Sequence, residues 1–300
     1  MKKYILTAIF CLFLMEGKPL LANERASEQE APEEPDYAFF TGSPYTQAKD
    51  SIQLILGNIF SRNGVLGGNQ KLLTHSLRTE WGFTDNLETD VIVQYVNQWT
   101  KSGGSTVGQN GFGDTTFGVR YRFLREESSP ITLTFGPQVL IPTGDVEGGL
   151  SNGSFGFAWD LTMARDWSKR FFNYASFNYS TTPNVTDPTA GSTREFVLNN
   201  INWGLAPAFR LFEKEGSRGG HYCLHLFTEW AGTVSQSVMV GTTVGQKVTA
   251  ATTLFSPGLR FGYLNKEETL IEIGLAAPVG LTQEAPDWGL FLQTQFEYVF

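Results

Sequence analysis

The chain has 300 residues and a formal net charge of -8; aromatic residues make up 14% of it, and charged residues only 17%, against about 25% in typical soluble domains. The acidic balance argues against nucleic-acid binding, which requires a basic surface. Beyond the first 15 residues no apolar run approaches the ~18 residues of a membrane-spanning helix, which excludes a helical membrane protein.

The first segment is typical of a secretory signal peptide. Lys2 and Lys3 precede an apolar run, residues 4–15, that is too short to cross a bilayer as a helix. We expect residues 1–22 to be cleaved off after Ala22. This removes three lysines and one glutamate, so the net charge changes from -8 to -10.

Two other interpretations of this segment are weaker. A buried N-terminal helix is one, and a lipoprotein acylated at Cys11 is the other, although the bulky Phe10 precedes that cysteine. With the signal peptide removed, Cys223 is the single cysteine that remains, so the mature chain forms no intramolecular disulfide.

Residues 23–50 are expected to form an acidic N-terminal segment in the periplasm. Its first part, residues 23–36, reads "NERASEQEAPEEPD" and has no hydrophobic period. Acidic, proline-containing sequences of this kind bury too little apolar surface to fold, so we expect a disordered spacer.

From residue 51 to residue 300 the sequence repeats a unit of about ten alternating residues followed by a turn or loop. In "FGDTTFGVRYRFL", for example, Phe117, Val119 and Tyr121 share one face of a strand, while Arg120 and Arg122 share the other. The pattern predicts twelve strands, at residues 51–60, 71–83, 87–99, 112–124, 130–141, 155–165, 170–182, 195–212, 221–234, 250–264, 269–278 and 287–300.

The connections between these strands alternate in length. Short charged turns such as "TDN" (84–86) and "REESS" (125–129) are followed by longer loops rich in Gly, Ser, Thr and Asn, such as "PTGDVEGGLSNGS" (142–154). Outer-membrane barrels have short periplasmic turns and long outer loops. The sequence therefore predicts an all-β transmembrane antiparallel up-and-down β-barrel of about 12 strands over residues 51–300, in contact with lipid in the outer membrane of a Gram-negative bacterium.

The last strand ends on three aromatic residues that share one face. Phe296, Tyr298 and Phe300 alternate with polar neighbours, and the strand must pair with the first one to close the barrel. This pattern resembles the terminal signal that outer-membrane barrels present to the barrel assembly machinery, which we expect to be a partner. Aromatic rings also suit the lipid–water boundary.

Two motifs carry a family resemblance. "GFGD" contains Gly111, Gly113 and Asp114, and "PTGD" covers residues 142–145 (Pro142, Thr143, Gly144 and Asp145) after the next strand. Over about residues 112–145 the chain resembles the MetA-pathway phenol-degradation family of outer-membrane proteins. The resemblance implies a barrel that moves small molecules, aromatic ones among them, and it supplies no catalytic residues.

The three histidines do not indicate an enzyme. None belongs to a His-x-Ser pair of the kind found in outer-membrane phospholipases. His221 and His225 share a strand face with Glu229, but residues four apart on a strand are about 13 Å apart, too far for one metal ion. The sequence thus predicts no catalytic residue, no metal site and no cofactor.

Charged side chains on the inner faces are the candidate pore-lining residues. A charge on the lipid side would cost about 2–4 kcal/mol at mid-bilayer for Arg or Lys, so inward placement is expected. One interpretation is ion pairing that braces the wall, and the other is a mixed-charge constriction near the periplasmic mouth. The candidates are Arg78, Glu80, Glu88, Asp90, Asp114, Arg120, Arg122, Asp160, Arg210, Glu229, Arg260, Glu272 and Glu297.

These observations favour a channel or transporter for passive passage of small solutes, aromatic or hydrophobic compounds among them. The alternative is a narrow, plugged barrel that displays loops without transport, and an outer-membrane enzyme is a third hypothesis. Twelve strands leave less room than the 16–18 of water-filled porins. The sequence carries no indication of an oligomeric state.

We expect deletion of Phe300 to impair insertion into the outer membrane while synthesis and export continue, because the closing strand loses its terminal aromatic residue. The measurement is the yield of heat-modifiable protein in the outer-membrane fraction. An unchanged yield would contradict the terminal-signal interpretation.

Overall fold

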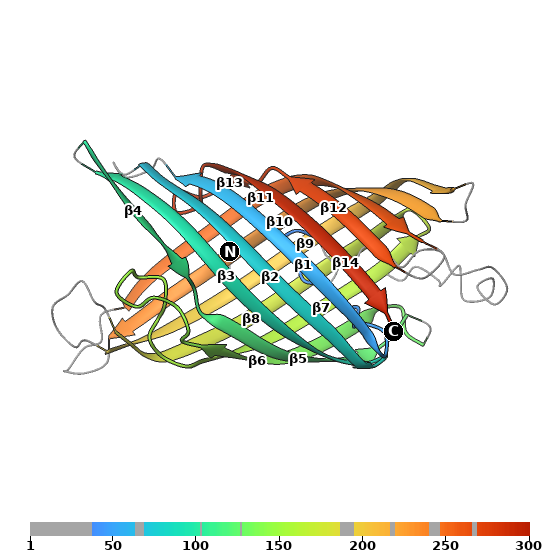
Figure 1. Cartoon of the computed structure of the whole chain (residues 1–300), viewed down its shortest axis with the longest axis horizontal. Coiled ribbons are helices and arrows are strands. Elements are labelled where there is room, and N and C mark those ends of the chain that lie inside the picture. The colour runs from blue at the N-terminus through green and yellow to red at the C-terminus, as the bar shows by residue number, and fades with distance from the viewer. Residues whose placement is uncertain are drawn as a thin grey trace.

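The computed structural model describes residues 38–63, 69–102, 104–126, 128–186, 195–216, 220–239, 247–265 and 269–300, and its strands close into one antiparallel barrel (Figure 1). The expected signal peptide and residues 23–37 of the acidic segment lie outside these residues. No helix long and apolar enough to span a bilayer occurs in the part of the chain that is described.

The strands follow the alternating segments of the sequence closely. Where apolar and polar residues alternate, an extended backbone places each kind on its own face of the sheet. The strands are β1 (Ser51–Asn63), β2 (Asn69–Thr84), β3 (Leu87–Ser102), β4 (Ser105–Phe112), β5 (Thr115–Leu124), β6 (Thr132–Ile141), β7 (Gly156–Ser168), β8 (Phe171–Thr186), β9 (Glu195–Glu215), β10 (His221–Met239), β11 (Lys247–Leu264), β12 (Leu270–Ala276), β13 (Val279–Gly280) and β14 (Trp288–Val299).

These fourteen segments make twelve strands of the wall. β4 and β5 both pair with β3, at its two ends, and so continue one another across residues 113–114. In the same way β12 and β13 both lie between β11 and β14. The prediction of about twelve strands is confirmed; the predicted strand 112–124 begins earlier, at residue 105, and is interrupted.

The last strand pairs with the first and closes the barrel, as the sequence predicts. β14 runs antiparallel to β1, with Phe296 opposite Leu54 and Tyr298 opposite Ile52. Every other pair of neighbours in the wall is also antiparallel, so the topology is up-and-down. Pairing of β14 with β1 leaves neither of these two strands as an open edge towards lipid.

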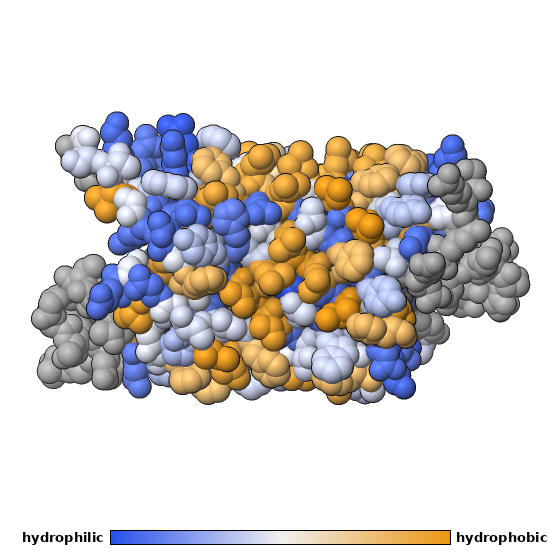
Figure 2. Space-filling model, viewed as in Figure 1, coloured by the Kyte–Doolittle hydropathy of each residue, from blue (hydrophilic) through white to orange (hydrophobic). Residues whose placement is uncertain are grey.

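The two faces of the wall differ in the way expected of a membrane barrel. On β14, Leu290 and Leu292 are exposed on the outer surface, whereas Gln293, Gln295 and Glu297 are buried on the inner one. Figure 2 shows apolar residues over much of the middle of the wall and hydrophilic residues towards its ends. An apolar outer band with a polar interior is the pattern that lipid requires.

The three terminal aromatic residues lie on the outer surface. Phe296 and Tyr298 are each 43% exposed and Phe300 is 78% exposed, while the alternating Glu297 is turned inward. Their position suits contact with lipid. Recognition by the assembly machinery stays a prediction.

Residues 38–48 lie inside the barrel, and we call them the lumenal segment; Lys49 and Asp50, which follow, are exposed. This position differs from the sequence-based expectation, in which residues 23–50 form one acidic segment in the periplasm. Ala38 and Phe39 belong to a buried cluster with Phe172, Phe227 and Phe291 of the wall, among other residues. Lys49 and Asp50 connect the segment to β1 at Ser51.

The topology predicts which connections face outwards. A peptide tag inserted after Gly149, in the loop between β6 and β7, should bind antibody on intact cells, whereas a tag after Ser128, in the turn between β5 and β6, should bind only after permeabilisation. Both positions are exposed, so insertion is tolerated equally. The opposite labelling pattern would show that the barrel has the inverse orientation in the membrane.

Candidate functional site

The lumenal segment contacts the wall on opposite sides of the lumen, and these contacts define the candidate site. Residues 38–41 lie against β10, β11 and β12. Residues 42–45 lie against β5 to β8, and residues 46–48 lie against β2 and β3. The segment therefore crosses the barrel interior before it enters β1.

The first anchor is the carboxylate of Glu229 on β10, which is fully buried. It accepts hydrogen bonds from three consecutive backbone amides: Phe39 N at 2.9 Å, Phe40 N at 3.1 and 3.2 Å, and Thr41 N at 3.1 Å. Successive N–H groups that converge on an anion form a concave binding site for it. Here the anion belongs to the wall and the amides belong to the lumenal segment.

The ring of Phe39 occupies a pocket in the wall next to this anchor. Its centroid lies 6.0 Å from that of Phe227 and 5.6 Å from that of Phe291, both in edge-to-face geometry. The guanidinium carbon of Arg260 lies 5.2 Å from the ring centroid. Two glycines on adjacent strands make room: a Cβ on Gly274 would lie 2.7 Å from Cε1 of the ring, and one on Gly258 would clash with Cε2.

Arg260 links the segment to a second carboxylate. Its Nη2 donates to the Ala38 carbonyl oxygen at 3.3 Å and to Gln293 Oε1. Its Nη1 lies 3.5 Å from Glu272 Oε2, and both side chains are buried. The ion pair joins the inner faces of the neighbouring strands β11 and β12, and Arg260 holds the start of the lumenal segment.

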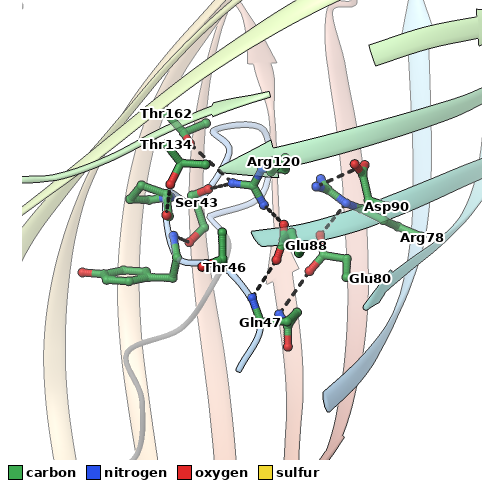
Figure 3. A network of polar contacts seen from close by, with 12 residues as sticks. Ser43, Thr46, Gln47, Arg78, Glu80, Glu88, Asp90, Arg120, Thr134 and Thr162 are labelled. Carbon is green, nitrogen blue, oxygen red and sulfur yellow. Dashed lines mark hydrogen bonds and ion pairs between the residues drawn. The ribbon is translucent and has the colours of Figure 1, made fainter. Parts of the chain in front are cut away.

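A second group of contacts surrounds Arg120 on β5 (Figure 3). Its Nη1 lies 2.5 Å from Glu88 Oε1, and both residues are almost completely buried. Its Nη2 donates to the Ser43 carbonyl oxygen and, at 3.4 Å, to Thr162 Oγ1. Arg120 is thus a bridge between the wall and the lumenal segment.

The third group of contacts holds Gln47. Its backbone N–H donates to Glu88 Oε2 at 2.6 Å, and its side-chain Nε2 donates to Glu80 Oε2 at 3.2 Å (Figure 3). Arg78 lies 2.6 Å from Glu80 and 3.4 Å from Asp90, so the carboxylates of β2 and β3 share this cation. Buried charges are tolerated only when they are paired or hydrogen-bonded in this way.

The remaining candidates from the sequence lie elsewhere. Arg210 contacts His225 and Glu213 near the turn after β9, and Arg122 donates to the Asp85 carbonyl oxygen at the turn before β3. Glu297 accepts from Gln53 at 3.4 Å. Asp160 points towards Gly42 of the lumenal segment. That these residues line an open pore stays a prediction.

Asp114 has a distinct position, in which the two family motifs meet. Its carboxylate accepts hydrogen bonds from Gly144 N at 3.3 Å and Asn152 N at 3.1 Å. Thr143 Oγ1 lies 2.7 Å from Thr115 Oγ1 and accepts from Thr115 N at 3.0 Å. "GFGD" and "PTGD" therefore fasten the loop between β6 and β7 to the start of β5.

One glycine of these motifs, Gly144, has a steric role. A Cβ on Gly144 would lie 2.7 Å from the carbonyl carbon of Gly113 and 2.8 Å from the Phe112 carbonyl oxygen. Only glycine allows the two backbones to approach so closely. The close approach of the two backbones is the physical reason for a glycine at residue 144 of the "PTGD" motif.

Arg120 and Arg122 allow a matched test on one strand face. Replacement of Arg120 by serine leaves Glu88 buried without its ion-pair partner, which typically costs about 3–5 kcal/mol, whereas Arg122→Ser removes a contact at an exposed turn and should cost less than about 1 kcal/mol. We expect a clearly lower thermal midpoint of heat-modifiable mobility for the first variant only. Equal midpoints would contradict the bridging role of Arg120.

Comparison with known proteins agrees with this architecture. No curated protein matches the sequence. An outer membrane channel from Pseudomonas putida F1 superposes with a TM-score of 0.62 at 13% identity, covering 89% of this chain and 100% of the channel. The β-domain of the Bordetella autotransporter BrkA superposes with a TM-score of 0.51 at 10% identity, covering 84% of this chain and 100% of that domain. At these identities the likeness shows the fold.

The family is shown by the sequence itself. A family model described as "Putative MetA-pathway of phenol degradation" matches residues 41–211, more than half of the 300-residue chain. The match begins within the lumenal segment and includes both glycine-rich motifs. This chain, an outer-membrane β-barrel, belongs to that family.

Proposed function

We propose that the protein is an outer-membrane channel for passive passage of small solutes, aromatic compounds among them, and that the lumenal segment is its gate. One observation carries the proposal: the segment crosses the interior but forms no strand of the wall. Backbone groups of residues 39, 43 and 47 bond to wall side chains, Glu229, Arg120 and Glu88, rather than to the backbone of a neighbouring strand. It can therefore leave while the wall stays closed.

The interior supports passage of solutes that combine polar and aromatic groups. Charged pairs such as Arg120–Glu88 and Arg260–Glu272 remain paired within the wall when the segment moves. Beside Arg260, Phe227 and Phe291 belong to a buried cluster of aromatic rings that also includes Phe172. A lumen with both kinds of surface suits small aromatic molecules better than ions alone.

A plugged barrel without transport is the alternative, and the depth of burial of the segment favours it. Residues such as Thr41, Ser43 and Gln47 are almost completely buried and are fitted closely to the wall. We do not propose an enzymatic role. His225 Nε2 accepts a hydrogen bond from Arg210, and Glu229 binds backbone amides, so neither inward side chain is arranged as a base.

A disulfide between the segment and the wall tests the gate directly. A Cβ on Gly42 would lie 3.9 Å from the Ser176 Cβ, within the range of about 3.5–4.5 Å found in disulfides. The same Cβ would lie 2.8 Å from the Thr162 methyl group, so Thr162→Ser is added to make room; it keeps the hydroxyl that Arg120 contacts. The test variant is Gly42→Cys/Ser176→Cys/Thr162→Ser.

We expect the oxidised variant to be silent in a planar bilayer and to conduct after reduction in the same chamber. The control is Gly42→Cys/Thr162→Ser, which cannot form the lock and should conduct equally under both conditions. If oxidised and reduced protein conduct alike, the segment is not the gate. If wild type, control and reduced variant are all silent, the plugged barrel is the correct function.

A further inference from the structure

We propose that the pocket now filled by Phe39 is a binding site for an aromatic amine, a compound with a ring and a protonated nitrogen two carbons away. The inference deepens the proposed function, on which it rests, by giving one substrate class to one place in the lumen. In this view residues 38–41 are an internal occupant that a solute replaces.

The ring part of the site is built by the wall. Phe227 and Phe291 contribute ring edges and faces, and Arg260 lies over the Phe39 ring at 5.2 Å. Gly258 and Gly274 leave a flat recess that any side chain would fill. All of these wall groups are buried with Phe39 in place, so the recess lies inside the barrel and not on its outer surface.

The polar part of the site lies at a fixed spacing from the ring. Phe39 N, which is separated from its own ring by two carbons, donates to Glu229 Oε2 at 2.9 Å. In 2-phenylethylamine the nitrogen stands at the same separation from the ring. Such a molecule can therefore place its ring in the recess while its ammonium group donates a hydrogen bond to Glu229.

Charge favours an amine over a neutral or acidic analogue. When the segment leaves, Glu229 loses its three amide donors, and a carboxylate inside the barrel then requires new donors. Arg260 loses the Ala38 carbonyl oxygen at the same time but keeps Glu272 and Gln293 as partners. A protonated amine supplies Glu229 with a charge-assisted donor, whereas a carboxylate would be repelled.

A neighbouring hydroxyl is unused while Phe39 is in place. Ser256 lies directly opposite Glu229 in the β10–β11 pair and is completely buried. Its Oγ has no hydrogen-bond partner among the described residues. An ammonium group has three donors, so it can serve Ser256 as well as both oxygens of Glu229.

The test is equilibrium dialysis of radiolabelled 2-phenylethylamine against the full chain purified in detergent. Wild type should bind weakly, because the internal Phe39 competes. Phe39→Ala should bind at least about tenfold more tightly, and adding Glu229→Gln to it should lose about tenfold, the effect of a charge-assisted bond. Glu284→Gln, at an exposed carboxylate between β13 and β14, is the matched control and should change nothing.

Competing compounds separate the site from a simple cavity. Unlabelled 2-phenylethylamine should displace the label from Phe39→Ala, while 3-phenylpropionate and ethylbenzene should not at equal concentration. Equal competition by ethylbenzene, or full affinity in Phe39→Ala/Glu229→Gln, would overturn the proposal. If Phe39→Ala does not assemble, Phe39→Leu keeps an apolar side chain without the ring and must give the same ranking.

The dialysis and conductance measurements test two separate claims, the binding site and the channel. An amine that binds as expected to a barrel that never conducts would refute the channel and leave the site. A barrel that is gated by the disulfide but does not bind the amine would refute this site alone.

Discussion

The hydrogen bonds between Glu229 and three consecutive amides are the interaction on which the interior depends. Hydrogen bonds to a charged group contribute about 1.5–3 kcal/mol each, and burial of a Phe side chain contributes about 1.5–3 kcal/mol more. Against this stands the conformational entropy of a segment without regular structure, at about 1–2 kcal/mol for each residue. The segment is therefore held by several noncovalent contacts, whose gain is offset in part by the entropy lost on ordering it.

The wall is stable for a different reason. Its strands form a closed ladder in which β14 joins β1, and lipid accepts no open edge. The lumenal segment adds no ladder of its own, since it contacts wall side chains through single amides and carbonyls. Stability of the barrel and position of the segment are therefore largely separate properties of one chain.

Most of the wall could be predicted from the sequence, because alternation decides which face of a strand each residue occupies. It placed Arg120, Glu229 and Glu297 inward and Phe296 outward without knowledge of any contact. Alternation carries no information about which charges meet. The pairing of Arg120 with Glu88 depends on the register between β3 and β5.

The lumenal segment could not be predicted in this way. Residues 38–47 read "AFFTGSPYTQ", which has no strand period and resembles a loop. One feature of the sequence did indicate a different role for these residues. The acidic stretch before them gives way to two aromatic residues followed by small polar ones. The partners of the segment, Gly258 and Gly274, are single glycines on inner faces more than 200 residues away. The contacts of Asp114 likewise could not be predicted without the position of the loop between β6 and β7.

The glycine recess has an evolutionary consequence. The side chain of residue 39 occupies the space that side chains at residues 258 and 274 would otherwise fill. We expect these three positions to vary together among relatives: where residue 39 is aromatic both glycines persist, and where it is small, alanine or serine can enter the wall. A substitution at residue 39 is then accompanied by substitutions at residues 258 and 274.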